Sequence, residues 1–428
     1  MGNPRPKRHQ PAKPRSKKDR LSHLPDAIIH RILSLLPDTK FAAQTSVLSK
    51  AWKNLWISNP DLSLDTGYHM NSHSFEEFLL HILEQRDREN CTAVSSLRLS
   101  INYRYSYSAD DKYQIISGSF DEVRLRDWTV KHAVRNGVRH LNLSHHYDVV
   151  QFPVPASALS GCRTLKTLEL AHLDVSGLMS SSACFPAVTT LRLEDCNFDK
   201  FFNITDLSCP NLNSLHLLDF AVCGRRGGSR GGVVEISATK LVCLKMEGVG
   251  CDRIKLSAVN LQVFLFSNAG ETGITRRMSD DFRMDLPCLQ SVEVLLYGSC
   301  HGEEDKLMKL LYGIRNAASL KVNVPPLEVL YKAGLLKHKT SPYSNLKSLK
   351  LLVEKRNGGR KNKGRLNVPD GIRIYLLSGA PNPETVDIII EEDEDRTELL
   401  LGGNGPRDNI GSASNQSSFG HHLMASVI

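Results

Sequence analysis

The residues best suited to chemistry in this 428-residue sequence do not gather into a catalytic or metal-binding pattern. Its ten cysteines lie at irregular intervals, without a C-x-x-C pair or a Cys/His grouping of the spacing that zinc requires. The pair His145-His146 has no carboxylate or cysteine partner at ligand spacing, so we interpret it as a pair of loop histidines. Walker-type, G-x-S-x-G and H-E-x-x-H motifs are missing. The sequence therefore indicates a protein that is not an enzyme and uses no cofactor or metal.

The positive charge of the sequence is concentrated at its N-terminus. Residues 1–20 hold eight Lys or Arg and one Asp, which accounts for +7 of the net charge of +8 and leaves +1 for the remainder. We expect residues 1–19 to be a disordered basic tail, serving either as a nuclear-localisation arm or as an inert solvated leader. A signal-peptide core and a run of about 18 apolar residues are missing, so we expect a nuclear or cytoplasmic protein without a membrane partner.

Two further basic segments, residues 223–232 and 355–365, are rich in glycine and arginine or lysine. Segments of this composition can contact RNA, but aromatic residues that could stack on bases are not interleaved with these. We therefore favour solvated insertions, and nucleic acid is not the expected partner.

The elements that must position any binding site follow a repeating pattern. A phrase of apolar, any and apolar residues begins at Leu97, Leu141, Leu168, Leu191, Leu215, Leu244, Phe264, Val292, Leu320, Leu349 and Val386. Most of the intervals lie in the range of roughly 20–29 residues that is typical of leucine-rich repeats. Each phrase predicts a short strand with one buried face, and such units must stack into a curved solenoid to bury it. A β-sandwich would show strands every 8–12 residues or so, and a doubly wound α/β fold would need longer helical patterns between strands.

Residues 120–136 predict a helix in the longest interval, with Gly137 as its C-cap and Trp128 in the core. Residues 19–59 predict two more. In the first, apolar residues recur at intervals of four from Leu24 to Leu36, between Pro25-Asp26 and Pro37-Asp38. The second is expected to run from Val47 to Asn59 and to carry Trp52 and Trp56. Such a segment is typical either of an interface or of a helical cap over the next domain.

The stretch from Leu21 to Trp56 resembles an F-box, and specifically the F-box of plant F-box/leucine-rich-repeat proteins. The resemblance is carried by Leu24-Pro25-Asp26, Ile28, Ile32-Leu33, Leu36-Pro37, Thr45-Ser46-Val47-Leu48-Ser49-Lys50, Trp52 and Leu55-Trp56. A second stretch resembles the FBD region that closes many of these proteins. It comprises residues 343–351 and 374–386, with Pro383 where a leucine is usual.

The resemblance implies a fold of the α+β or α/β solenoid class. It consists of a small all-helical F-box at residues 20–61 and a curved leucine-rich-repeat domain at residues 62–400, whose FBD-like region spans about 342–392. Residues 401–428 are expected to be a disordered tail.

The resemblance also implies a function, the substrate-recognition adaptor of a Skp–cullin–F-box ubiquitin ligase. The F-box would dock the Skp adaptor, and through it the cullin–RING ligase, while the repeats would bind a target protein. The residues implied in the small domain and its docking patch are Leu24, Pro25, Ile28, Ile32, Leu33, Val47, Leu48, Trp52, Leu55 and Trp56. The alternative is a repeat scaffold that binds RNA or other partners through the basic segments, independently of ubiquitin ligase.

Overall fold

The computed structural model of the chain describes most of the sequence between residues 21 and 391. The described residues are 21, 24–50, 52–69, 72–88, 94–102, 105–107, 113–115, 122–146, 153–154, 156–160, 162–179, 184–198, 201–205, 208–222, 232–249, 253–267, 284–297, 300–337, 341–354, 368–380 and 385–391.

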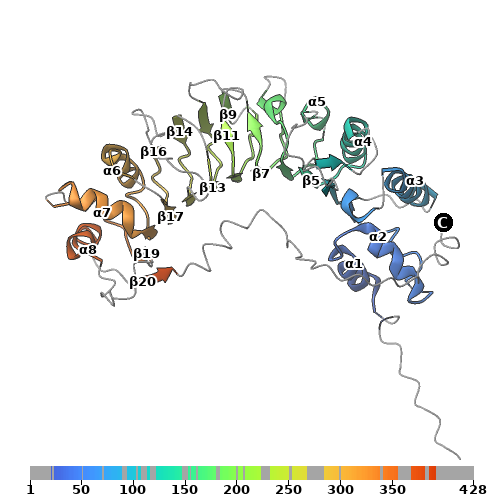
Figure 1. Ribbon diagram of the computed structural model, residues 1–428, viewed down its shortest axis with the longest axis horizontal. Coiled ribbons are helices and arrows are strands. Elements are labelled where there is room, and N and C mark those ends of the chain that lie inside the picture. The colour runs from blue at the N-terminus through green and yellow to red at the C-terminus, as the bar shows by residue number, and fades with distance from the viewer. Residues whose placement is uncertain are drawn as a thin grey trace, which may run out of the picture.

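Twelve parallel strands form one curved sheet that lines the inner side of an arch (Figure 1). In sheet order they are β1 (Asp61–Asp65), β2 (Ser96–Asn102), β5 (His140–His146), β6 (Thr167–Ala171), β7 (Thr190–Glu194), β10 (Ser214–Leu218), β13 (Cys243–Glu247), β15 (Val263–Ser267), β17 (Ser291–Leu295), β18 (Ser319–Asn323), β19 (Ser348–Glu354) and β20 (Thr385–Glu391). Sheet order follows sequence order, as in a solenoid. Every phrase predicted to be a strand lies in one of these strands, so this prediction is confirmed.

The alternation of residues within each strand explains why the repeats stack. In β6, Leu168 and Leu170 are buried between half-buried neighbours. They lie directly beside Leu141 and Leu143 of β5 and Leu191 and Leu193 of β7, so equivalent apolar side chains form continuous rows along the core. The leucines that precede the strands are also buried, namely Leu165, Leu212, Leu241, Leu261, Leu289 and Leu346.

The repeats in the middle of the arch turn in the same way after each strand. His172, Asp195, Asp219 and Gly248 have positive φ angles of 56°, 44°, 45° and 61°. Each donates its backbone N–H to the carbonyl at the end of the next strand, as from His172 to Glu194 at 2.9 Å. A Cβ at position 248 would lie 2.3 Å from Oδ1 and 3.2 Å from Cα of Asp219, so glycine fits this turn without displacing the Asp219 side chain.

Helices and short strands cover the outer side of the arch (Figure 1). The helices are α3 (Ser72–Arg88), α4 (Glu122–Arg135), α5 (Ala156–Leu159), α6 (Glu304–Gly313), α7 (Val324–Lys332) and α8 (Asp370–Leu377). A second parallel sheet, in the order β16 (Met284–Asp285), β14 (Arg253–Ser257), β12 (Val233–Ser237) and β9 (Phe201–Thr205), takes their place in the middle. The chain also forms two small strand pairs, β8 (Asn197–Phe198) with β11 (Ala221–Val222) and β3 (Tyr105–Tyr107) with β4 (Tyr113–Ile115), and the 3-10 turns η2 (Thr66–Tyr68) and η3 (Ser176–Met179).

The predicted helix at residues 120–136 is confirmed by α4, and Gly137 follows it with a φ of 64°. The side chain of Trp128 lies outside what the structure describes. Other intervals also contain helices, α6, α7 and α8, which we did not predict from the sequence. These short helices form because the sheet buries residues such as Leu307 and Leu327.

At one end of the arch lies a small helical unit, residues 24–60, which we call the N-terminal unit (Figure 1). It contains α1 (Asp26–Ser34), α2 (Thr39–Gln44) and the 3-10 turn η1 (Thr45–Val47). The second long helix expected from Val47 to Asn59 is not formed, because residues 52–58 run as successive turns. Packing of both tryptophans into the core takes precedence there over helical periodicity. No helix of the described residues is long and apolar enough to cross a membrane.

Candidate docking site

One face of α1 exposes large apolar side chains. Ile28, Ile32 and Leu35 are 49%, 36% and 69% exposed. They stand at positions i, i+4 and i+7, which share one side of a helix. Their neighbours Ile29 and Leu33 are buried on the opposite side. The helix is therefore apolar on two sides, and only one of them packs against the protein.

The turn after α2 exposes two more apolar residues. Val47 is 77% exposed and Leu48 is 55% exposed. Pro25, which precedes α1, is also exposed. Single exposed apolar residues are ordinary on protein surfaces, but this number in so small a unit is typical of an interaction site. We call the set Pro25, Ile28, Ile32, Leu35, Val47 and Leu48 the docking surface.

The other residues implied in partner binding form the core of the N-terminal unit. Leu33, Trp52 and Trp56 are buried, and Leu24 and Leu55 are partly buried and pack against the same core. The indole Nε1 of Trp52 lies 3.4 Å from the carbonyl oxygen of Leu21, to which it donates. The structure thus separates the ten residues into an exposed group and a supporting group. It also adds Leu35, which the spacing of seven residues from Ile28 could have shown.

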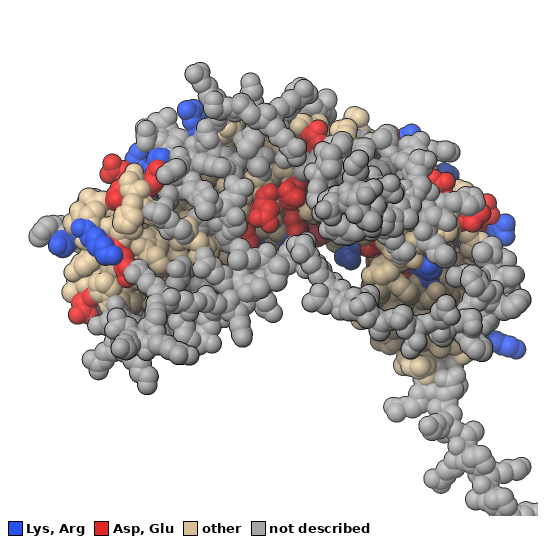
Figure 2. All heavy atoms as spheres, viewed as in Figure 1, with Lys and Arg blue, Asp and Glu red and all other residues tan. Residues whose placement is uncertain are grey.

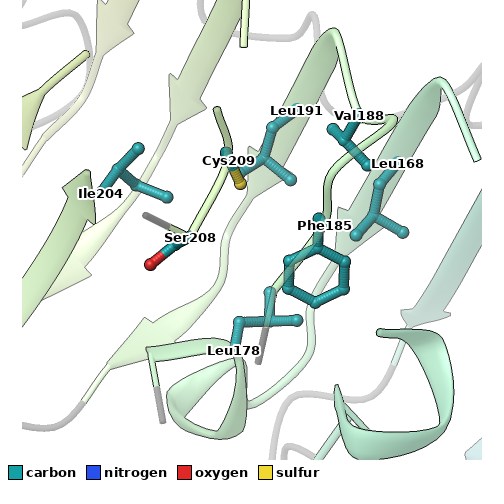
Figure 3. Close-up of a pocket in the computed structure, with 8 residues that line it drawn as sticks. All are labelled: Leu168, Leu178, Phe185, Val188, Leu191, Ile204, Ser208 and Cys209. Atoms are coloured by element: carbon teal, nitrogen blue, oxygen red, sulfur yellow. The ribbon is translucent and has the colours of Figure 1, made fainter. Parts of the chain in front are cut away.

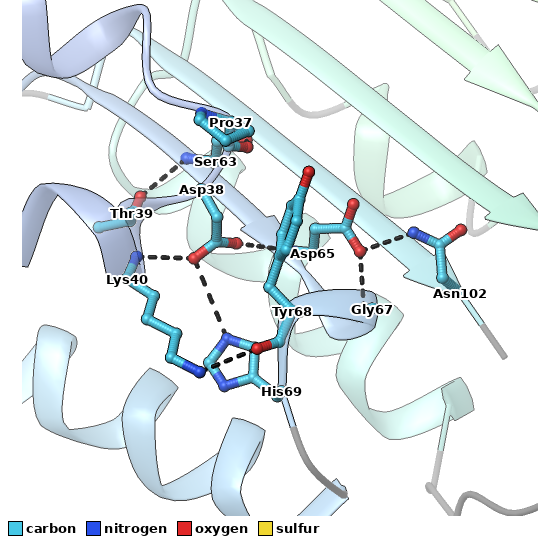
Figure 4. Close-up of polar contacts among 10 residues, drawn as sticks. All are labelled: Pro37, Asp38, Thr39, Lys40, Ser63, Asp65, Gly67, Tyr68, His69 and Asn102. Atoms are coloured by element: carbon cyan, nitrogen blue, oxygen red, sulfur yellow. Dashed lines mark hydrogen bonds and ion pairs between the residues drawn. The ribbon is translucent and has the colours of Figure 1, made fainter. Parts of the chain in front are cut away.

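The N-terminal unit covers the open edge of the large sheet. The strand β1 is the first in the sheet, so its outer N–H groups have no strand to pair with in the described structure. Two side chains at the start of α2 accept these N–H groups instead: Oγ1 of Thr39 lies 3.0 Å from N of Ser63, and Oδ2 of Asp38 lies 2.6 Å from N of Asp65 (Figure 4). Asp38 also caps α2 by accepting the N–H of Lys40 at 2.6 Å. The carboxylate of Asp38 therefore caps the N-terminus of α2 and also accepts an N–H group at the edge of the large sheet.

Further contacts hold the same junction (Figure 4). The ammonium group of Lys40 donates to the carbonyl of Tyr68 at 2.8 Å, and the hydroxyl of Ser63 donates to the carbonyl of Pro37 at 2.9 Å. On another side of the unit, the buried guanidinium of Arg86 from α3 donates to the carbonyls of Ile57 and Asn59 at 2.5 and 2.8 Å. Side chains from α2, β1 and α3 thus join the N-terminal unit to the first repeat.

Burial shifts the protonation of two groups at this junction. Desolvation raises the pKa of Asp38 to about 6, against the opposing effect of the two backbone N–H groups that it accepts. Desolvation, together with the charge of Lys40, lowers the pKa of His69 to about 4. The imidazole lies 4.0 Å from the Asp38 carboxylate and packs edge-on against the ring of Phe75. At neutral pH the junction therefore contains a neutral histidine beside a buried carboxylate.

In each strand, the side chains that point away from the core lie on the inner face of the arch. Many of these side chains are charged. Acidic side chains gather under the middle of the arch (Figure 2). They alternate with cations that pair with them: Arg192 with Glu194 at 2.7 Å, Lys245 with Glu247 at 2.8 Å, and Lys321 with Glu293 at 2.9 Å. The inner face therefore has polar character without a strong excess of either charge.

The described residues form an open surface depression on α8, lined by Asp370, Arg373, Ile374, Leu377 and Ser378, and a much smaller cavity under the large sheet. One enclosed apolar cavity of about 10 Å³ lies between the sheet and the outer layer, lined by Leu168, Leu178, Phe185, Val188, Leu191, Ile204, Ser208 and Cys209 (Figure 3). A space of this size and polarity is a packing gap and not a binding site. Within the part of the chain that the structure describes, no group of three His, Cys, Asp or Glu side chains could hold a metal ion.

The histidine pair lies in strand β5, which corrects its interpretation as a loop. His145 is buried, whereas the exposed ring of His146 lies 4.8 Å from that of His172. Burial raises the pKa of Cys196 and of Cys209 to about 12, so these thiols are not reactive at neutral pH. The basic tail and the basic segments at 223–231 and 355–365 lie outside the described residues.

The sequence of this chain is similar to those of known proteins, both in the N-terminal unit and in the repeats. Residues 21–63 match the family model of the F-box domain. An F-box/FBD/LRR-repeat protein of Arabidopsis thaliana is 28% identical over 366 residues, which cover 78% of this chain and 68% of the relative. An F-box/LRR-repeat protein of the same plant is 25% identical over 375 residues, covering 86% and 77% of the two chains. A further F-box/FBD/LRR-repeat protein of that plant is 33% identical over 202 residues, which cover 46% of this chain and 42% of the relative.

Proposed function

We propose, from the premise that this chain is a plant-type F-box/leucine-rich-repeat protein, that it is the substrate-recognition subunit of a Skp–cullin–F-box ubiquitin ligase. The F-box, taken as residues 20–61, docks the Skp adaptor. The repeats, taken as residues 62–400, hold a target protein. The chain itself supplies no catalytic group, and it acts in the nucleus or the cytoplasm.

The docking surface is the observation that carries the proposal. An unbound N-terminal unit leaves Ile28, Ile32 and Leu35 in water along one helix face, together with Val47 and Leu48 after α2. Full burial of a fully exposed side chain of this kind yields roughly 1.5–3 kcal/mol, and each of these residues would gain a share of that in proportion to its exposed fraction. The supporting tryptophans and Leu33 hold this surface in place from behind.

The junction supports the second half of the proposal. A ligase of this kind accelerates ubiquitin transfer by holding the target close to the ubiquitin-carrying enzyme, which requires a fixed geometry and not an active-site residue. The hydrogen bonds of Asp38, Thr39 and Arg86 attach the N-terminal unit directly to β1 and α3, the first strand and the first helix of the solenoid. The adaptor and the target would therefore be held at a constant separation.

The test is the affinity of the full chain for a plant Skp adaptor, measured by biolayer interferometry. The double variant Val47→Asp/Leu48→Asp places two charges in the interface, so binding should weaken at least a hundredfold. Its matched control is Leu80→Asp, since Leu80 on α3 is 58% exposed and lies outside the docking surface. Unchanged affinity in the double variant would overturn the proposal.

Trp52→Ala is a weaker test, although the sequence pointed to it. Trp52 lies in the core, and its removal costs about 3–5 kcal/mol by leaving a cavity. Loss of binding in that variant would report unfolding of the N-terminal unit. The RNA-binding alternative remains a separate hypothesis, because the basic segments on which it rests lie outside the described residues.

A further inference from the structure

The inner face of the arch is organised in two rows that cross the strands. The first position of most strands is a serine or threonine, which gives a hydroxyl row of Ser96, Thr167, Thr190, Ser214, Ser291, Ser319, Ser348 and Thr385. The third position is polar or charged, which gives a charged row of Arg98, Asn142, Glu169, Arg192, His216, Lys245, Glu293, Lys321, Lys350 and Asp387. Because the buried residues between these positions face the core, both rows face the inside of the arch.

Strand β15 interrupts both rows at once. Its first and third positions are Val263 and Leu265, in register with Cys243 and Lys245 of β13 on one side and with Ser291 and Glu293 of β17 on the other. Among the twelve described strands of the large sheet, it alone has apolar residues at both positions.

Both side chains are only partly buried, and neither belongs to the apolar residues that pack against the core. Their alternate neighbours Phe264 and Phe266 supply the core side of the strand. Core packing therefore does not explain why β15 has Val263 and Leu265 where other strands have a serine and a lysine. Val263 and Leu265 form an apolar step between the polar residues that β13 and β17 place in the charged row, Lys245 and Glu293.

The charges beside this step are balanced. In the charged row, Lys245 precedes Leu265 and Glu293 follows it, and each is already paired, Lys245 with Glu247 and Glu293 with Lys321. A polyanion would have to break these pairs to reach the cations, and a polycation would have to break them to reach the acids. An apolar centre with a ring of satisfied polar groups is instead the arrangement of a protein-binding hot spot.

We propose that the step at Val263 and Leu265 is the anchor point for the target, and that its occupant is an extended protein segment of low net charge with one large apolar side chain. The inference rests on the proposed function and names the class of partner that the repeats take. Strands in a sheet lie about 4.8 Å apart, and alternate residues of an extended segment lie about 6.6 Å apart. Because these two spacings are similar, a segment that crosses the strands can place one apolar side chain against β15. Its polar neighbours then face the hydroxyl row and the ion pairs of the adjacent strands.

The experiment selects a phage-displayed library of random linear peptides on the immobilised full chain. Affinities of enriched peptides, labelled with a fluorophore, are then measured by anisotropy. We expect the enriched peptides to share a large apolar residue and to bind Leu265→Asp at least tenfold more weakly than the native chain. Leu265→Ser removes the apolar contact without a new charge, so it should show the same direction of change.

The matched control is Ile374→Asp on α8, which changes an exposed apolar residue on the outer layer and should leave peptide affinity unchanged. Melting temperatures of all variants identify any that fail to fold. Enrichment of no peptide, enrichment of peptides without an apolar residue, or binding to Leu265→Asp and Leu265→Ser as tight as to the native chain would each overturn the inference. Adaptor binding by the same preparations is a separate readout, so a failure of the anchor point is distinguishable from a failure of the ligase proposal.

Discussion

Adjacent apolar residues of α1 have different roles. Ile29 is buried, whereas Ile28 is largely exposed, although the two side chains are identical. Removal of the buried one weakens the fold, and removal of the exposed one leaves the fold unchanged and takes away contact area for a partner. A substitution in this helix is therefore interpretable only when its side of the helix is known.

Tyr343 illustrates how a single buried polar atom contributes to stability. The side chain is fully buried, and its hydroxyl donates to the carbonyl of Leu311 in the last turn of α6 at 3.1 Å. Burial raises the pKa of this phenol well above its usual range, so the group stays protonated and donates at neutral pH. The bond satisfies one of the carbonyls that a helix leaves unpaired at its C-terminus.

We predict that Tyr343→Phe lowers the free energy of unfolding by about 1–3 kcal/mol, because the Leu311 carbonyl stays buried without its donor. Urea denaturation followed by circular dichroism measures the change. Tyr312→Phe is the matched control, since Tyr312 lies on the same helix and is 59% exposed. Equal stability of Tyr343→Phe and the native chain would show that water or a shift of α6 replaces the bond.

The opposed pKa shifts of Asp38 and His69 give a prediction on pH. The pKa of Asp38 is raised in the folded chain, so its contribution to stability is greatest below about pH 4 and is lost as the pH rises through about 6. The pKa of His69 is lowered, so its contribution is present above about pH 6.5 and is lost as the pH falls through about 4. In the native chain the two effects offset each other between these limits.

Asp38→Asn keeps a residue that can cap α2 but removes the gain on acidification, so the variant should lose stability more steeply than the native chain between pH 6.5 and 4. His69→Leu removes the loss instead, and its stability should hold or rise over the same range. Melting temperature against pH, recorded for the three proteins, tests both. Parallel curves would contradict the assignment of the two shifts to these groups.

At the scale of elements, the strands of the arch were predictable because each is specified by its own residues. A phrase such as Leu168-Glu169-Leu170 shows which alternate side chains are apolar, and this period of two is visible in the sequence without knowledge of the neighbouring strands. The helix α4 has apolar residues at helical spacing and a glycine after it, and it too was predictable. By contrast, α7 begins with Pro325-Pro326, residues that suit the first turn of a helix but equally suggest a break.

The candidate site was predictable as a set of residues but not as a surface. The spacing from Leu24 to Leu36 marks a helix, but because apolar residues occupy two sides of it, the periodicity does not decide which side meets a partner. The region of Trp52 has helical spacing and yet forms turns, because tertiary packing of the indole determines its backbone. The role of Thr39 and Asp38 at the edge of β1 depends on a contact between residues that are 24 and 27 positions apart.

For the whole molecule, the two roles of the N-terminal unit that the sequence presented as alternatives, a cap and an interface, are compatible. Its inner side closes the edge of a twelve-stranded sheet, which repeat proteins need in order to stay soluble. Its outer side presents the docking surface. Because one carboxylate, Asp38, both begins α2 and accepts from β1, movement of the docking unit away from the arch would expose the sheet edge. The contacts that cover the sheet edge therefore also fix the orientation of the proposed docking surface relative to the arch.

This coupling predicts the behaviour of a truncated chain. Removal of residues 1–60 takes away the acceptors of the N–H groups of Ser63 and Asp65. It should also expose Leu62 and Leu64, which are buried in the full chain. An uncovered edge with apolar side chains is a template for pairing with another chain, so we expect the truncated protein to associate and to melt at a lower temperature. Removal of residues 1–19 alone should leave both properties unchanged. Analytical ultracentrifugation over a range of concentrations measures the association. A truncated chain that stays monomeric and melts with the native protein would mean that the repeats close their own edge, and that the docking unit is attached to the arch without supporting it.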